Sequence, residues 1–431
     1  MPALLPFLLA AASLPPITFT DTRLENGLRV IISEDRAAPV FAICVTYQVG
    51  SKDERPGRTG FAHLFEHMMF KGSDNVGPGE HFYLIFNNGG SMNGTTNKDR
   101  TNYYEILPKN QLDLALFLES DRMRSLAITK ENLENQRQAV KEERRLSLDN
   151  RPYGTIFERA GELVYSNFAY KHSTIGSMAD LDAASVDDVT AVFKTYYAPN
   201  NATVVLVGDL DTKATLAKVR KYFGDIPRQP APKPVDLADP PQAEEKRETI
   251  NDKFARLPRV DLMYKVPPAS EDDFYALYML SHVLGGGESS RLYQVLVKDK
   301  EAAVQTGSFA QPQKGPGMFW VFAMTRPGKA TSEVEGLIAE EIARLHSAPV
   351  SEKELLRVRR RVRRDAIETR QSALLRAREI ANNAVLFNDP NLINTELDRL
   401  LAVTPEQMQK AAQKYLKTPS RTVITTIPAA K

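Results

Sequence analysis

The sequence predicts an α+β fold of two related domains, each an antiparallel-rich β-sheet covered by α-helices. Two observations lead to this prediction: a proline-rich stretch divides the chain, and the segments that end the two parts resemble each other. Ser185–Tyr196 precedes APNNATVVLVG, and Thr404–Tyr415 precedes LKTPSRTVITTI. The two copies keep one offset, because 404 − 185 and 415 − 196 both give 219. Each copy has a Ser or Thr N-cap, an amphipathic helix and a β-branched strand, which indicates a duplicated domain.

The proline-rich stretch is predicted to be an inter-domain linker. Six of the 27 prolines lie between Pro227 and Pro241, in a segment without apolar periodicity. Such a segment cannot pack as a helix or a central strand and is typical of a stiff, extended linker. The expected units are an N-terminal domain over 17–224, a linker over 225–250 and a C-terminal domain over 251–431.

Residues 1–16, MPALLPFLLAAASLPP, form a separate apolar segment. The run is too short to span a bilayer as a helix, and its small residues Ala10–Ala12 suit cleavage of a secretory signal, although no basic residue precedes it. The alternative is an unpacked apolar N-terminus. A cleaved signal predicts a periplasmic or secreted protein, and otherwise we expect a cytoplasmic one. No other stretch has the roughly 18 consecutive apolar residues of a transmembrane helix.

In the N-terminal domain, strands and helices mix without strict βαβ alternation. Asn26-Gly27 between two apolar runs predicts a hairpin turn. Predicted strands cover 17–24, 28–33, 40–49, 91–97 and 101–107, and helical patterns cover 59–88 and 112–148. In the C-terminal domain we expect a strand over 260–266, a helix over 272–284, two strands near 305–324 and long helices over 332–401.

The composition excludes several classes of protein. The 431 residues are 42% hydrophobic and 26% charged, with a formal net charge of +2. These values argue against intrinsic disorder and against nucleic-acid binding. Cys44 is the only cysteine, so no intramolecular disulfide can form, and any metal site must use His and carboxylate ligands.

The most informative segment is TGFAHLFEHMMF, over residues 59–70. Its apolar residues recur at helical spacing on one face, and His63, Glu66 and His67 lie on the opposite face. Two imidazoles one turn apart can bind one metal ion, with the carboxylate beside it. The H-x-x-E-H order is the reverse of the zincin motif and marks the inverzincins. A catalytic zinc normally has three protein ligands, and the downstream helical stretch offers Glu142 and Glu143 for the third place.

At this point the chain resembles the inverzincin metallopeptidases of pitrilysin, insulin-degrading enzyme and the mitochondrial processing peptidase, in their half-size, two-domain form. The resemblance covers nearly the whole chain after residue 16. It rests on segments in the same order: HLFEHMMFKG (63–72), GGSMNGTT (89–96), ESDRM (119–123), the Glu142-Glu143 helix and GGGESSRL (285–292).

The resemblance implies a zinc-dependent endopeptidase with one Zn²⁺ per chain. It favours Glu143 as the third ligand with His63 and His67, because the family's ligand lies about 76 residues after the second His, and 143 − 67 is 76. Glu66 would act as general base on a zinc-activated water. The family often has a glutamate seven residues before the third ligand, where this chain has Gln136, which can form hydrogen bonds but cannot serve as a base.

The resemblance also implies how a peptide is held. Asn93, Gly94 and Thr95 correspond to an exposed edge strand near the zinc, to which an extended peptide adds as a further strand. The alternative is that Asn93-Gly94 only forms a turn.

The C-terminal domain lacks two groups that the resemblance predicts. It has no H-x-x-E-H motif, and no Arg/Tyr pair follows Ser290-Arg291-Leu292 to stabilise the oxyanion. We therefore expect a homologous subunit without a metal site to supply this pair in a heterodimer that encloses the zinc. Arg291 or Lys298 as substitutes, and a homodimer, are the alternatives. The rival from another class is a non-catalytic scaffold of the same fold, such as the core proteins of the respiratory cytochrome complex.

Overall fold

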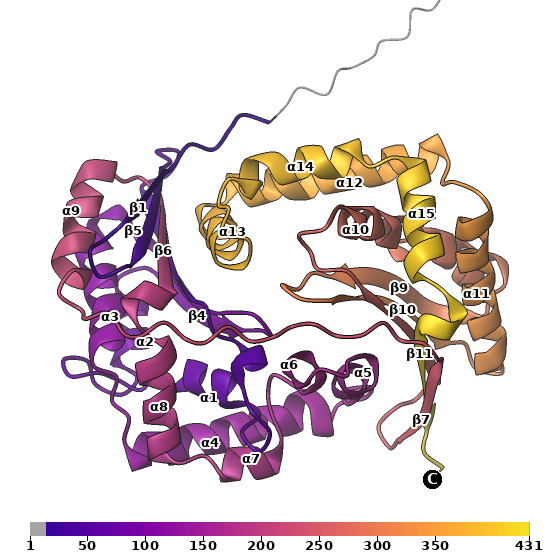
Figure 1. The fold of residues 1–431 in the computed structure, drawn as a ribbon, viewed down its shortest axis with the longest axis horizontal. Helices are drawn as coiled ribbons and strands as arrows, with labels where there is room; N and C mark the ends of the chain where they lie inside the picture. The colour runs from indigo at the N-terminus through magenta and orange to yellow at the C-terminus, as the bar shows by residue number, and fades with distance from the viewer. Residues whose placement is uncertain (1–13, 431) are drawn as a thin grey trace, which may run out of the picture.

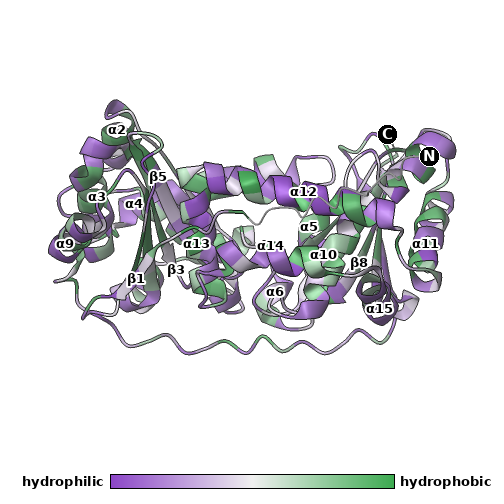
Figure 2. Ribbon diagram, turned by 90° about the horizontal axis from the view of Figure 1, so that it is seen from above, coloured by the Kyte–Doolittle hydropathy of each residue, from purple (hydrophilic) through white to green (hydrophobic). Residues whose placement is uncertain are grey.

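The computed structural model describes residues 14–430. Most of the predicted leader, residues 1–13, therefore lies outside the described residues. Among the described residues, no helix is long and apolar enough to cross a membrane. The chain forms two α/β halves, joined by an extended segment that crosses the view of Figure 1 and runs along one side of the molecule in Figure 2. We call residues 17–224 the N-terminal half and residues 246–430, which include the whole second sheet, the C-terminal half.

Each half contains one β-sheet, and the two sheets have the same topology. The sheet orders are β1-β2-β6-β3-β5-β4 and β7-β11-β8-β10-β9. Without β1 the orders correspond strand for strand, and in each sheet one pair is parallel (β2 with β6, β7 with β11) while the others are antiparallel. This match confirms the predicted duplicated α+β fold. The strands are β1 Thr20–Arg23, β2 Arg29–Glu34, β3 Val40–Tyr47, β4 Ser91–Thr96, β5 Thr101–Pro108, β6 Ala202–Gly208, β7 Lys246–Asp252, β8 Arg259–Val266, β9 Ala303–Gln311, β10 Gly317–Thr325 and β11 Arg421–Pro428.

The helices are shorter than the sequence patterns predict, because turns interrupt three of the long stretches. The stretch 59–88 forms two helices separated by a loop with Gly72 at φ 98° and Gly79 at φ 77°, a conformation that favours glycine. The stretch 112–148 is divided before Thr129, which caps the second helix. In the N-terminal half the helices are α1 Phe61–Met68, α2 Glu80–Asn87, α3 Leu112–Arg124, α4 Lys130–Arg144, α5 Ile156–Val164, α6 Phe168–Lys171, α7 Met178–Asp182, α8 Val186–Tyr196 and α9 Thr212–Phe223.

In the C-terminal half, too, turns divide the long helical stretch into shorter helices. Ser351 and Ser372 each cap a new helix inside the stretch 332–401, which therefore forms four helices rather than one rod. Its helices are α10 Asp272–Gly285, α11 Thr331–Ser347, α12 Glu352–Gln371, α13 Ala373–Leu386, α14 Leu392–Ala402 and α15 Pro405–Tyr415. Short helical turns are η1 Ser51–Asp53, η2 Lys109–Gln111, η3 Arg145–Asp149, η4 Pro199–Asn201, η5 Tyr293–Asp299 and η6 Thr418–Ser420.

Each sheet is covered on its outer face by helices of its own half. Because strand side chains alternate, one set of residues on β2, β3 and β6 packs against α1, α3, α8 and α9. The equivalent set on β8 and β10 packs against α10, α11, α12 and α15.

The inner faces are covered in exchange, each by a helix of the other half. Ala42, Cys44 and Val205 of the N-terminal sheet pack against Ala377 and Ala381 of α13. In return, α5 and the segment through α6 pack against β8, β10 and β11, with Ile156, Ala160 and Tyr170 beside Met263 and Trp320. Residue 156 plus the offset of 219 falls within α13, so the exchanged helices are equivalent segments of the repeat. Both views show α13 beside the N-terminal sheet (Figures 1 and 2).

Polar contacts also join the halves near the loop between β4 and β5. The Tyr170 hydroxyl donates to Asp99 Oδ1 at 2.8 Å and accepts from the Gly315 amide at 2.8 Å. Asp99 Oδ2 accepts from the Lys314 amide at 3.0 Å. Two buried side chains of the N-terminal half thus hold the hairpin turn between β9 and β10.

A buried polar cluster lies beneath β5. His81 Nε2 is 2.6 Å from Glu105 Oε1, and Arg122 donates to Glu119. Burial raises the pKa values of Glu105 and Glu119 to about 7, and it lowers the pKa of His81 to about 3. We conclude that His81 is neutral and that Arg122 balances the charge of one carboxylate, that of Glu119. Glu105 and Glu119 together then retain one proton near neutral pH.

We predict that Glu105→Gln becomes more stable relative to the wild type as the pH rises. The folded-state pKa of Glu105 is raised from 4.5, so its contribution is complete below about pH 4.5 and is lost as the pH rises through about 7. Glutamine keeps a donor and an acceptor but cannot ionise. Urea unfolding between pH 5 and pH 8 should show a relative gain on the order of 1–3 kcal/mol. The exposed Glu406→Gln is the control, and a pH-independent difference for Glu105→Gln would contradict the assignment.

Candidate metal centre

The histidines of the H-x-x-E-H segment lie on α1, whose orientation is fixed by its apolar face. Phe61, Leu64, Phe65 and Met68 are buried in the core of the N-terminal half. The opposite face therefore carries His63 and His67, which remain partly exposed, with ring centroids 4.7 Å apart. The predicted helix places both imidazoles on one side, as two metal ligands require.

The third group comes from α4, which packs against α1. Glu143 Oε2 lies 3.3 Å from His67 Nε2 and 3.6 Å from His63 Nε2. Ligand atoms of a tetrahedral zinc with bonds near 2.0–2.1 Å lie about 3.3–3.4 Å apart, so this spacing fits one zinc ion. Glu142 points elsewhere and accepts from Arg145 at 2.9 Å. The three groups His63, His67 and Glu143 are therefore the set that the structure brings together.

The electrostatics of these groups also suit a metal. Burial, with a smaller contribution from the neighbouring His67, lowers the pKa of His63 to about 4, so that its ring is neutral near pH 7. The hydrogen bond from His67 lowers the pKa of Glu143. A neutral imidazole and an ionised carboxylate are the forms that bind zinc.

Glu66 lies on the same helix as the two histidines but is not one of the three groups that converge. Glu66 is only 8% exposed, and its Oε2 accepts a hydrogen bond from Thr96 Oγ1 at 2.6 Å. Burial raises the pKa of Glu66, and the Thr96 hydrogen bond opposes that shift. A Cβ on Gly94 would lie 3.0 Å from Glu66 Oε1, so β4 approaches the carboxylate closely because residue 94 has no side chain.

The residues that were predicted to hold a peptide, Asn93, Gly94 and Thr95, lie on β4, which is an edge strand of its sheet. Asn93 is exposed, and its Oδ1 accepts from the Gly94 amide at 2.8 Å. Thr95 Oγ1 donates to Asn102 Oδ1 at 2.7 Å. Asn93 and Gly94 form part of a regular strand paired with β5, and the alternative of a turn at these residues is wrong.

Three further candidates, Gln136, Arg291 and Lys298, make contacts with other residues. Gln136 is buried on α4 and donates its amide to Asn135. Arg291 pairs with Glu354 of α12, with its Nε 2.6 Å from Oε1. Lys298 in η5 lies over the Tyr293 ring, 5.9 Å from its centroid.

Sequence reasoning missed Thr96, which holds the carboxylate of Glu66. Side chains alternate along a strand, so Gly94 and Thr96 share the face toward α1, whereas Asn93 and Thr95 face the other way. The alternation of side chains along the strand would have identified Thr96 from the sequence, but only if the proximity of Gly94 to Glu66 had been known. His81, Glu105 and Glu119 also bring three donor atoms together, but Arg122 already binds Glu119, which disfavours a cation there.

Comparisons with known proteins match both halves of the chain. A family model described as Insulinase (Peptidase family M16) matches residues 29–176, and one described as Peptidase M16 inactive domain matches residues 183–362. The first match contains both histidines and Glu143. Among the described residues, the two groups of side chains close enough to share a metal ion, His63/His67/Glu143 and His81/Glu105/Glu119, both lie in the N-terminal half.

Similar proteins cover nearly the whole chain. The zinc protease PqqE of Helicobacter pylori is 28% identical over 405 residues, which is 93% of this chain and 91% of that protein. The solved structure of a protease from Helicobacter pylori has a TM-score of 0.92 at 28% identity and covers 96% of this chain and 100% of that one. The first half of the periplasmic protease PqqL from Escherichia coli has a TM-score of 0.78 at 19% identity, covering 96% and 93%, which shows a shared fold.

Proposed function

Because the chain belongs to the insulinase family of peptidases (family M16), we propose that it is a zinc-dependent endopeptidase that cleaves extended peptides or unfolded protein segments. The observation that carries the proposal is the convergence of His63, His67 and Glu143 beside the buried Glu66. Zinc held by the three ligands would polarise a peptide carbonyl and supply a water with a pKa near roughly 7.

Glu66 is the group that moves the proton in this proposal. Thr96 holds its Oε2, which leaves Oε1 to accept a proton from the attacking water. The same oxygen then delivers that proton to the leaving amine. A carboxyl whose pKa is raised by burial suits both roles, because it exchanges a proton more readily near neutral pH.

The edge strand β4 is the proposed binding surface for the peptide backbone. Its outer backbone groups can pair with an extended chain without regard to side chains. Asn93, exposed on this strand, would bind a carbonyl next to the cleavage point. The proximity of Gly94 to Glu66 would bring the scissile bond close to the base.

We further propose a partner subunit. Arg291 is engaged by Glu354, and the C-terminal half has no Arg/Tyr pair at the expected place. A homologous subunit without a metal site would supply the pair and close the two halves into a chamber, with a homodimer as the alternative. The scaffold alternative is disfavoured, since a subunit without catalysis has no need for a base beside three ligands. The apolar residues 1–16 and the periplasmic relative support a periplasmic location.

We predict that Glu143→Gln loses zinc and that Glu142→Gln keeps it. Both variants remove one negative charge from adjacent positions, but only Glu143 lies within reach of the histidines. Elemental analysis after dialysis should give about one zinc per chain for the wild type and for Glu142→Gln. Equal zinc contents in the two variants would contradict the ligand assignment.

We predict that Glu66→Gln retains zinc but loses peptide hydrolysis by about 10²–10⁴-fold in kcat, which is the usual contribution of a general base. Glutamine can still accept from Thr96 but cannot take a proton from water. Cleavage of an unstructured peptide library, measured on zinc-loaded protein, tests this. Full activity in the variant would rule out Glu66 as the base.

We predict that the chain alone hydrolyses peptides weakly and that a homologous Arg/Tyr subunit raises kcat on the order of a hundredfold or more. Loss of one oxyanion donor typically has an effect of this size. Rates before and after adding candidate subunits, with the sedimentation behaviour of the mixture, provide the measurement. Equal rates with and without partners would show that the chain is complete by itself.

A further inference from the structure

The metal-binding helix α1 begins without a capping side chain of its own. Its N-cap is Gly60, in the left-handed region at φ 84°, and its first turn contains no acidic residue. The open amides are bound instead by Glu54, which precedes the helix. Glu54 Oε2 accepts from the Gly60 amide at 2.9 Å, and Oε1 accepts from the Ala62 amide at 2.7 Å. Glu54 thus supplies both the acceptors and the negative charge that a helix N-terminus favours.

Glu54 is in turn held by His172, which follows α6. His172 Nε2 lies 2.8 Å from Glu54 Oε2, and Nδ1 lies 2.7 Å from the Phe168 carbonyl oxygen. The His172 and Phe168 rings stack with centroids 4.4 Å apart. Both side chains of the pair are enclosed, with 9% of His172 and 4% of Glu54 exposed.

This arrangement requires one additional proton. A carbonyl oxygen only accepts, so Nδ1 must carry a hydrogen. The neutral ring then has a bare Nε2, which would face a carboxylate oxygen, and two acceptors at 2.8 Å repel each other. The contact therefore holds one proton between Nε2 and Oε2, whichever atom carries it. Burial raises the pKa of Glu54, while hydrogen bonds from His172 and the two amides lower it.

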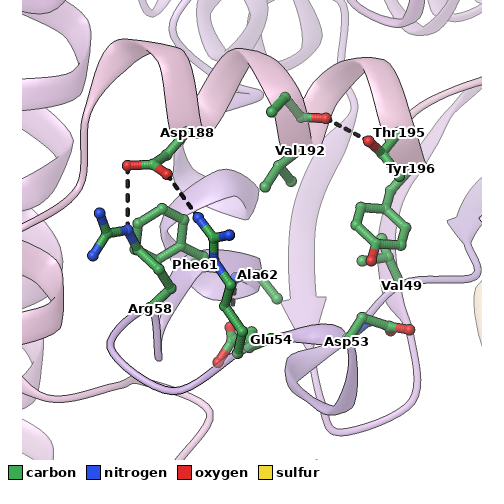
Figure 3. A pocket seen from close by; sticks show the side chains of 13 residues that line it. Val49, Asp53, Glu54, Arg58, Phe61, Ala62, Asp188, Val192, Thr195 and Tyr196 are labelled. Carbon is green, nitrogen blue, oxygen red and sulfur yellow. Dashed lines mark hydrogen bonds and ion pairs between the residues drawn. The ribbon is translucent and has the colours of Figure 1, made fainter. Parts of the chain in front are cut away.

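The pair lies where elements of several parts of the fold meet. Figure 3 shows Glu54 next to Ala62 at the floor of a cavity of about 250 Å³ between α8 and the start of α1. On the other side, Lys98 donates to the His172 carbonyl oxygen, and α6 packs with the sheet of the C-terminal half. The charged groups that line this cavity beside Glu54 are Asp53, Arg55, Arg58 and Asp188. Lys98 interacts electrostatically with Glu54, Asp99 and Glu158.

We propose that Glu54 and His172 are positioning residues, which share one proton and hold the first turn of the metal-binding helix in place. His63 follows Ala62 directly, so a shift of the anchored turn would move the first metal ligand and, one turn later, Glu66. The pair also joins α1 to the α6 segment, which covers the sheet of the other half. Its kinetic consequence rests on the proposed peptidase function, but its structural consequence does not.

The test uses hydrogen–deuterium exchange of the Gly60 and Ala62 amides in the full chain, expressed as protection factors. His172→Phe keeps the stacking on Phe168 but removes both ring nitrogens. We expect both amides to lose about tenfold or more of their protection, since a buried carboxylate without its partner is poorly held. His346→Phe on α11, far from the pair, should leave both amides unchanged.

The wild type and Glu54→Gln separate positioning from simple packing by their pH dependence. As the pH rises, the wild-type pair loses its shared proton, and the protection of Ala62 should fall. In Glu54→Gln the contact has no shared proton to lose as the pH rises, because the side-chain amide can donate to the bare Nε2 while its oxygen still accepts from Ala62. Ala62 should then stay protected independently of pH, while Gly60, left facing an N–H group, exchanges faster.

Unchanged protection in His172→Phe, or a wild type and Glu54→Gln with the same pH dependence, would overturn the proposal. The wild-type titration needs no substitution, so a variant that fails to fold does not remove the test. In zinc-loaded protein, kcat for peptide hydrolysis should decline on the alkaline side for the wild type and not for Glu54→Gln. Absence of hydrolysis in every form would refute the peptidase function and leave the exchange result to decide the positioning role.

Discussion

The structure depends on the exchange of equivalent helices between its halves. Each sheet has two apolar faces, and each half has helices for only one of them, so α13 and α5 must cross to cover the others. Separating the halves would expose both inner faces to water, at roughly 25 cal/mol per Å² of apolar surface. The segment that carries α5 into the C-terminal half continues through α6 to His172, which contacts Glu54 at the start of α1. Association of the halves and the orientation of the metal-binding helix are therefore parts of one packing arrangement.

The candidate site combines groups that would be unfavourable in isolation. His63 and Glu66 are largely removed from water, and their pKa values shift in opposite directions, toward the neutral form in each case. Charged and polar groups at such depth need partners, and the fold provides Thr96 for Glu66 and Glu143 for His67. α1 is rigid there because its apolar face is fully packed and its first turn is bound by Glu54. The site is thus assembled from two helices and an edge strand, each positioned by the core.

The sequence predicted the duplicated fold and the grouping of His63, Glu66 and His67, because local periodicity determines both. It left the choice between Glu142 and Glu143 open, since adjacent helical residues point about 100° apart and only the packing of α4 on α1 selects one of them. Only the ligand spacing that the family resemblance implies favoured Glu143. Residues such as 202–208, ATVVLVG, indicate a strand buried on both faces but not which helix covers it. Glu54 and His172 escaped notice because their pairing joins positions far apart in the chain, which no local pattern reports.

The exchange of α5 and α13 also determines the order in which the chain can fold. The inner face of the N-terminal sheet, with Ala42, Cys44 and Val205, is complete in sequence long before α13 has been synthesised. Until then that apolar face has no native partner, and its contacts are among the most non-local in the molecule. The N-terminal half therefore cannot reach its final packing until residues 373–386 have been synthesised. A chain of this design is most exposed to aggregation or chaperone binding at that late stage.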